Sequence, residues 1–179
     1  MEDLYSRYAS ALISIAEDEN KIEQYKDAMT SIFVLFNEDE NILKYLGSYF
    51  VNNDDKYKLI DEMLKTFELD NLNNFFKLIV NKHLIIHFKD IYLSFNKLAN
   101  ELLDIEEGII YSTIKLNEDE INKISEALTK RTSKKVELKN QIDESLIGGV
   151  KIVIRDRVYD SSIKYKLEQL KSSLIKKGA

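Results

Sequence analysis

Residues 144–170 read ESLIGGVKIVIRDRVYDSSIKYKLEQL and contain the sharpest change of pattern in the chain. The chain has five glycines and no proline, yet two of the glycines are adjacent, at Gly148 and Gly149. They lead into a run of β-branched residues, which favours a strand. Ser161 or Ser162 can then cap a helix whose apolar residues recur at helical spacing. The stretch therefore predicts two short strands followed by a closing helix.

The double glycine has two competing interpretations. A phosphate-binding loop needs several glycines and then lysine with serine or threonine at the start of a helix. In this chain the glycines precede a strand, and no Gly-Lys-Ser/Thr follows them. The pattern favours a structural role, in which Gly149 permits a bulge or a close backbone approach where a central strand begins.

The residues before this stretch extend the same domain. The segments GIIYSTIKL at 108–116 and KKVELKNQI at 134–142 both have the β-branched, alternating character of strands. Between them, residues 117–132 have the period of an amphipathic helix that Asn117 can cap. We therefore expect a small domain at 106–179 with a short β-sheet and two helices.

Residues 1–105 have helical periodicity almost throughout. Acidic or asparagine-rich segments separate the patterns and can cap the next helix. After the first helix, the others are expected at about 19–37, 40–50, 55–67, 70–82 and 86–105. The predicted fold class is α+β, with an N-terminal six-helix bundle at 1–105 and a domain boundary near 105–108.

The first helix carries two apolar stripes. One stripe consists of Leu4, Tyr8, Ala11, Leu12 and Ile15. The second stripe consists of Tyr5, Ala9, Ile13 and Ala16. A helix that is apolar on two faces is either enclosed by its neighbours or leaves one face for a partner.

Composition excludes several classes of protein. Residues 1–105 carry 11 basic and 19 acidic side chains, and the remainder carries 15 and 12, an excess too small to argue for nucleic acid. The absence of cysteine excludes disulfides and thiolate metal sites. No apolar run approaches the roughly 20 residues that span a bilayer, and the N-terminus lacks a secretory pattern. A cytoplasmic location is expected.

Candidate chemical sites are few. His83 and His87 in HLIIH have metal-ligand spacing on a helix, but Leu84 stands where a zinc protease has glutamate. A partly buried, hydrogen-bonded pair is favoured, and a metal-dependent enzyme is one alternative. The basic segment KRTSKK at 130–135 keeps open a nucleic-acid-binding α+β protein. The sequence predicts no enzyme, with no catalytic residue, metal or cofactor.

Three stretches resemble the delta subunit of F-type ATP synthase, the family of the oligomycin sensitivity-conferring protein. They are YASALISIA at 8–16, NFFKLIVNKHLIIHFKDI at 74–91 and the opening stretch at 144–170, and they keep register along the chain. Gly148, Gly149, Asp156 and Asp160 form the family's structural signature in the third stretch. The chain departs from the family's pattern at Leu84, Val153, Arg155 and Ser161.

The resemblance implies a non-catalytic stator adaptor of the proton- or sodium-driven rotary ATP synthase, which links the catalytic head to the peripheral stalk. Residues 1–105 would bind an amphipathic N-terminal helix of an alpha subunit, and 106–179 would bind the b subunits. It further implies one copy per complex, no nucleic acid, and a peripheral place on the cytoplasmic face of the cell membrane.

The resemblance also implies site residues. The alpha-subunit groove between the first and fifth helices would use Tyr5, Ala9, Leu12, Ile13, Ala16, Phe75, Phe76 and Ile79. The b-subunit contact would use Ile163, Leu167, Leu170 and Leu174 on the last helix. Alternatively, the first set fills the core of the bundle and the second set packs on the strands.

Overall fold

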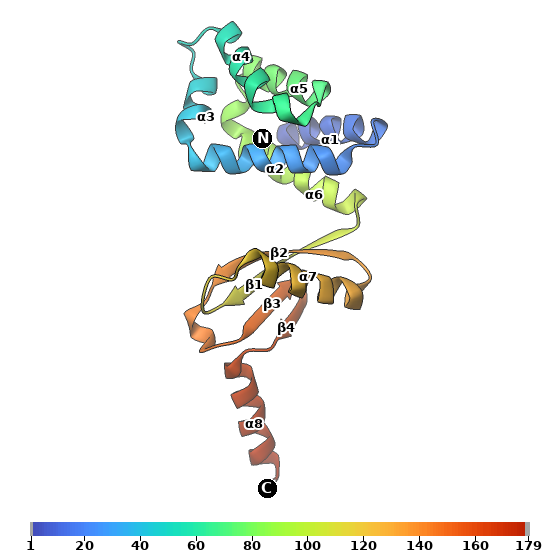
Figure 1. The fold of residues 1–179 in the computed structure, drawn as a ribbon, viewed down its shortest axis with the longest axis vertical. Coiled ribbons are helices and arrows are strands. Elements are labelled where there is room, and N and C mark those ends of the chain that lie inside the picture. The colour runs from blue at the N-terminus through green and yellow to red at the C-terminus, as the bar shows by residue number, and fades with distance from the viewer. Residues whose placement is uncertain (1, 178–179) are drawn as a thin grey trace. The chain divides into compact units, whose positions relative to one another are not determined.

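The computed structural model describes the backbone of residues 2–177 and the side chains of residues 4–169 and 171. The chain divides into two compact units, Met1–Leu103 and Asp104–Ala179. Within the described residues, helices form the first unit, and the second combines helices with one four-stranded sheet, as Figure 1 shows. The predicted α+β class is therefore confirmed.

The first unit consists of helices joined by short connections. Its α-helices are α1 (Glu2–Asp18), α2 (Ile22–Glu38), α3 (Glu40–Gly47), α4 (Asn53–Leu64), α5 (Asp70–Asn81) and α6 (Phe88–Leu102). Short 3-10 helices lie at Lys65–Phe67 and Ile85–His87. α3 ends three residues before its predicted end, because Ser48 is extended and its hydroxyl accepts a hydrogen bond from the N–H of Phe50.

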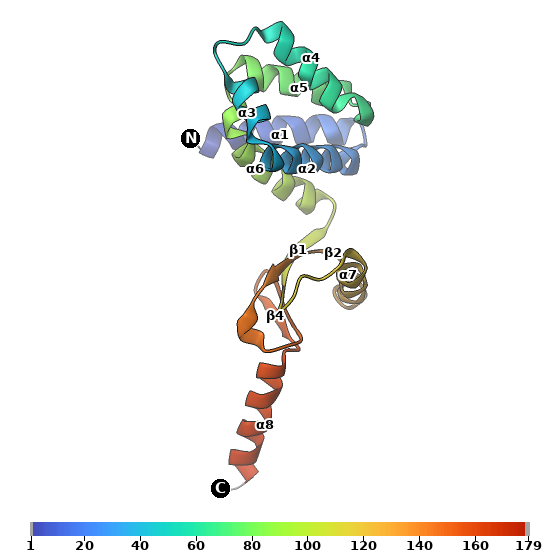
Figure 2. The same ribbon diagram turned by 60° about the vertical axis from the view of Figure 1, so that its left-hand side comes forward.

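The core of the first unit surrounds α1. Figures 1 and 2 both place α1 between α5 and α6, and α1 packs far more extensively on α6 than on α5. An aromatic cluster continues this core, with the ring of Phe88 5.1 Å from Phe36 and 5.3 Å from Phe76. Burial of one such side chain contributes about 1.5–3 kcal/mol, so this packing holds the helices together.

The second unit is built on a sheet with the strand order β2-β1-β3-β4. Its strands are β1 (Ile105–Ser112), β2 (Lys135–Ile142), β3 (Val150–Ile154) and β4 (Arg157–Asp160). β1 pairs with β2 in parallel and with β3 antiparallel, with Ile110 opposite Ile152. The crossover helix α7 (Glu118–Thr132) packs on β2, and α8 (Ile163–Lys177) ends the described chain. Asn117 caps α7 in a capping box with Glu120.

β1 begins and ends earlier than the predicted strand at 108–116. The strand already starts at Ile105, and its alternating burial runs from Glu106, upstream of Gly108. The sequence hides this start because Glu106 is acidic, yet the structure buries it with its carboxylate 3.6 Å from the guanidinium of Arg155. The strand ends at Ser112, whose hydroxyl donates a hydrogen bond to the carbonyl of Ile114.

The double glycine lies where the chain approaches the start of α8. Gly149 has φ +77°, and a Cβ added there would lie 2.8 Å from the carbonyl oxygen of Ser161. A Cβ on Gly148 would meet the side chain of Ile163 at 2.8 Å, and the Gly148 carbonyl accepts a hydrogen bond from the Ile163 N–H. The two glycines thus let the start of β3 and the start of α8 pack backbone to backbone.

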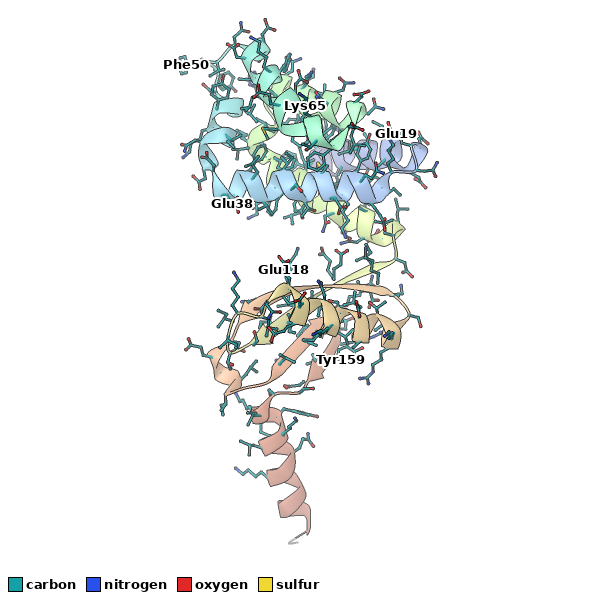
Figure 3. All side chains as sticks on the ribbon, in the orientation of Figure 1. Glu19, Glu38, Phe50, Lys65, Glu118 and Tyr159 are labelled. Carbon is teal, nitrogen blue, oxygen red and sulfur yellow. The ribbon has the colours of Figure 1, made fainter. Side chains whose placement is uncertain are left out.

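Glu19, labelled in Figure 3, connects three helices of the first unit. It follows α1 and accepts hydrogen bonds from Asn71 on α5, at 2.6 Å, and from the Tyr25 hydroxyl on α2, at 3.0 Å. The bond from Asn71, with that from Tyr25, holds the pKa of Glu19 below its usual range. Burial and the neighbouring Glu19 raise the pKa of Tyr25. The carboxylate therefore acts as a link that depends on its charge.

Gly149→Ala is expected to lower the free energy of unfolding by about 1–3 kcal/mol, because alanine at positive φ is strained and its methyl group meets backbone. Urea unfolding of the full chain measures the change. Gly47→Ala is the matched control, since its Cβ would lie close to the side chain of Ile86, which is exposed and can move, and would make only ordinary contact with Ile85 at 3.9 Å. Equal losses from both substitutions would contradict this account of Gly149.

Glu19→Gln is expected to remove a pH-dependent part of the stability. A depressed carboxyl pKa contributes stability above the unfolded pKa of about 4.3, and that stability is lost as the pH falls through the folded value. In urea unfolding at each pH, the wild type should therefore have a larger free energy of unfolding than the variant at pH 6. This difference should shrink towards pH 3. Glu17→Gln removes an exposed charge from the last turn of α1, two residues before Glu19, and should show no such trend.

Candidate partner-binding surfaces

Most residues predicted to form the alpha-subunit groove lie in the core of the first unit. Each of the following is at most 7% exposed: Tyr5, Ala9, Ile13, Ala16, Phe76 and Ile79. The physical reason is that this stripe of α1 faces the other helices of its own unit. The small side chains of Ala9 and Ala16 therefore admit the chain's own helices, and the expectation that they line a groove is wrong.

An open apolar groove nevertheless lies between α1 and α5, with a volume of about 550 Å³. It is lined by Leu4, Arg7, Tyr8, Ala11, Leu12, Ile15, Asn71, Asn74, Phe75 and Leu78. Leu12 and Phe75, both predicted, are buried and so form its floor. Leu78 is 44% exposed, and the ring of Tyr8 meets Phe75 edge to face with centroids 6.4 Å apart.

The groove uses the first apolar stripe of α1 rather than the second. Tyr8 and Ile15 are half-buried, and Ala11 between them is exposed and small. Polar side chains lie among the apolar side chains of the groove. Of the described residues that line it, Arg7 carries a charge. Such a surface, apolar and elongated between two helices, suits the apolar face of a third helix.

One end of the groove is fixed by the link described above. Asn71 lines the groove and also donates its hydrogen bond to Glu19. This bond ties the start of α5 to the end of α1, so the two walls keep their spacing before a guest arrives. A preformed groove loses less conformational entropy on binding.

The last helix has an exposed apolar stripe in its described part. Ile163 is 45% exposed and Leu167 is 54% exposed, so neither is packed away against the sheet. Leu170 and Leu174 lie on α8, but their side chains fall outside the described residues. The stripe thus begins on a helix whose described apolar side chains face solvent.

Polar residues of the predicted signature set the start of α8. Asp160 accepts a hydrogen bond from the N–H of Ser162, and the Ser162 hydroxyl accepts one from the N–H of Tyr165, so Ser162 is the cap. Asp156 lies in the tight turn between β3 and β4, where Arg155 has φ +49°. A glycine is thus absent from a position with the backbone geometry that favours one.

The two histidines do not share a helix. α5 ends at Asn81, and His83 has φ +56°, which breaks the helix before His87. His83 is exposed and stacks on Tyr49, whereas His87 stacks on Tyr5, which is in the core. Among the residues that the structure describes, no three His, Cys, Asp or Glu side chains are grouped to hold a metal. The helical spacing assumed for a metal pair is therefore wrong.

The basic segment at 130–135 makes contacts within its own unit. The guanidinium of Arg131 lies 5.1 Å from the ring centre of Tyr159. Lys134 pairs with Asp104 at 2.5 Å, and the ammonium of Lys135 lies 3.6 Å from a carboxylate oxygen of Glu137. These contacts give the segment a structural role. Separately, none of the helices within the described residues has the length and apolar character to cross a membrane.

Comparison with known proteins gives one consistent result. Residues 4–174 match the family described as ATP synthase delta (OSCP) subunit. The chain is 36% identical over 170 residues to ATP synthase subunit delta of Mycoplasma mobile, covering 95% of this chain and 94% of the relative. It is 31% identical to the protein of that name from Bacillus cytotoxicus, covering 98% and 97%.

Among solved structures, a chain of the Toxoplasma gondii mitochondrial ATP synthase hexamer shares the fold, with a TM-score of 0.65. The identity is 18%, and the match covers 96% of this chain and 97% of that one. Sequence and fold thus agree over nearly the full length of the relatives. The chain belongs to the ATP synthase delta (OSCP) subunit family, and it is a non-catalytic linking subunit of the peripheral stalk, the stator of ATP synthase.

Proposed function

We propose that the groove between α1 and α5 receives an amphipathic N-terminal helix of an ATP synthase alpha subunit. The observation that carries the proposal is the open apolar groove that the first unit leaves unfilled. Its floor, Leu12 and Phe75, belongs to the core, so a guest helix seated there extends that core. Burial of apolar anchors in a preformed groove supports micromolar or tighter affinity.

The second unit completes the adaptor. Residues 104–179 would hold the C-terminal ends of the b subunits, and the exposed stripe that starts at Ile163 and Leu167 supports this assignment. A stator must transmit force between two partners, which requires a separate binding surface for each. The two units of this chain supply one surface each, so that torque on the catalytic head is resisted during proton-driven ATP synthesis.

The remaining parts of the proposal concern location and stoichiometry. The chain would act as one copy per complex, monomeric when alone, on the cytoplasmic face of the cell membrane. Its contact with the membrane would run through the other subunits of the complex.

Ala11→Glu tests the groove. We expect the full-length variant to bind a peptide of about the first 20 residues of the alpha subunit from the same genome roughly tenfold more weakly, or worse. The reason is that a guest helix would strip water from the introduced carboxylate. Isothermal titration calorimetry measures the affinity.

Ser14→Glu is the matched control, because it adds the same charge at an exposed position of α1 outside the groove. It should bind the peptide as the wild type does. Equal weakening by the two substitutions would refute the position of the groove. Lack of any binding by the wild type, in calorimetry at several temperatures, would refute the alpha-subunit contact itself.

A further inference from the structure

Ile147 combines two unfavourable features. Its backbone has φ 64° and ψ −32°, a conformation in which a β-branched side chain is strained. Its side chain is also 68% exposed, so little burial within the chain offsets the strain. Glycine is the residue best suited to such a backbone, and the next two residues are glycines. The isolated chain thus gives no reason for isoleucine at this position.

Ile147 is joined to a residue that packs on the first turn of α8. It directly precedes Gly148, whose carbonyl accepts the Ile163 N–H at 3.0 Å, and whose Cβ position would touch the Ile163 side chain. Leu167 follows Ile163 by one helical turn on the same face of α8. Ile147, Ile163 and Leu167 are all at least 45% exposed, and we call them the Ile147 strip.

The helix that carries most of this strip is basic. The sequence of α8 contains five lysines and one glutamate in 15 residues, whereas the whole chain has a net charge of −5. Lys164 and Lys166 flank Ile163 and Leu167 and are exposed. A partner that covers the strip must therefore place its own charges beside these ammonium groups, and carboxylates are the complementary choice.

We propose that Ile147 is a strained anchor which, with Ile163 and Leu167, binds an amphipathic helix that has carboxylates beside its apolar stripe. This helix is the b-subunit segment, so the inference rests on the proposed function and specifies the chemistry of that contact. The backbone of the turn fixes the direction in which the exposed Ile147 side chain leaves it before binding, which reduces the ordering cost when the partner closes over it.

A helix fits these observations better than an anionic lipid surface does. A basic amphipathic helix alone could also lie on such a surface. A fluid bilayer, however, offers no shaped pocket, so a flexible residue would serve there as well as a strained one. A helix partner presents fixed gaps between its side chains, and a side chain held in one position can fill such a gap.

Ile147→Gly tests the inference because it moves stability and affinity in opposite directions. Removal of the strain should raise the Tm of the full chain by roughly 2–4 °C. Removal of the side chain should weaken binding to the soluble part of the b subunit from the same genome by about tenfold. Differential scanning calorimetry and biolayer interferometry, respectively, measure the two quantities.

Ser133→Gly is the matched control. Ser133 also has positive φ, 61°, at the end of α7 in the same unit, so the variant should gain stability without losing affinity. A second arm measures salt dependence, and the wild-type affinity should fall as sodium chloride rises from about 50 to 500 mM.

The possible outcomes separate the two claims. If the wild type does not bind the b-subunit probe, both the b-subunit contact and this inference fail. If it binds but Ile147→Gly binds equally well, or the variant loses both stability and affinity, only the anchor role fails. Affinity that is insensitive to salt, or preferential binding to phosphatidylglycerol vesicles, would overturn the acidic helix as the partner.

Discussion

The packing of α1 against the other helices of its unit is the constraint on which the binding surface depends. α1 is apolar on two faces, and the chain covers only one of them, mainly with α6. The small side chains of Ala9 and Ala16 allow that close packing and are fully buried. Because α5 meets α1 less extensively, Leu12 and Phe75 remain at the floor of an open groove. One apolar stripe of α1 thus belongs to the core, and the other belongs to the docking surface.

In the second unit, the binding surface depends on a close backbone approach between the start of β3 and the start of α8. Gly149 lets the backbone at the start of β3 approach Ser161 so closely that no side chain fits between them. That approach fixes the start of α8, where Ser162 provides the cap. The strained Ile147 stands beside this junction. Local strain and close packing therefore occur together at the surface that we assign to the b subunits.

Periodicity predicted the order of helices and strands well, and it failed where charge or local competition intervenes. The predicted start of β1 lies too far along the chain, because the acidic Glu106 does not resemble a buried strand residue. The sheet nevertheless buries Glu106 near Arg155. The prediction continues α3 past Gly47, but the Ser48 hydroxyl accepts a hydrogen bond from the backbone N–H of Phe50, and the helix ends there. Of the residues predicted for the alpha-subunit groove, Leu12 and Phe75 line the open groove between α1 and α5, and the others lie in the core. Exposed Leu78 was missed because one apolar residue beside buried Ile79 and Val80 carries no distinguishing pattern.

The α+β class, the family resemblance and the structural role of the double glycine could all be inferred from the amino-acid sequence alone. These depend on local preferences and spacing, which are properties of consecutive residues. Contacts in the folded chain were needed to establish which stripe of α1 is core and which is groove, and that Ile147 is both strained and exposed. Two apolar stripes on one helix are equivalent until a neighbour covers one of them, and that choice is made by contacts between residues distant in the chain.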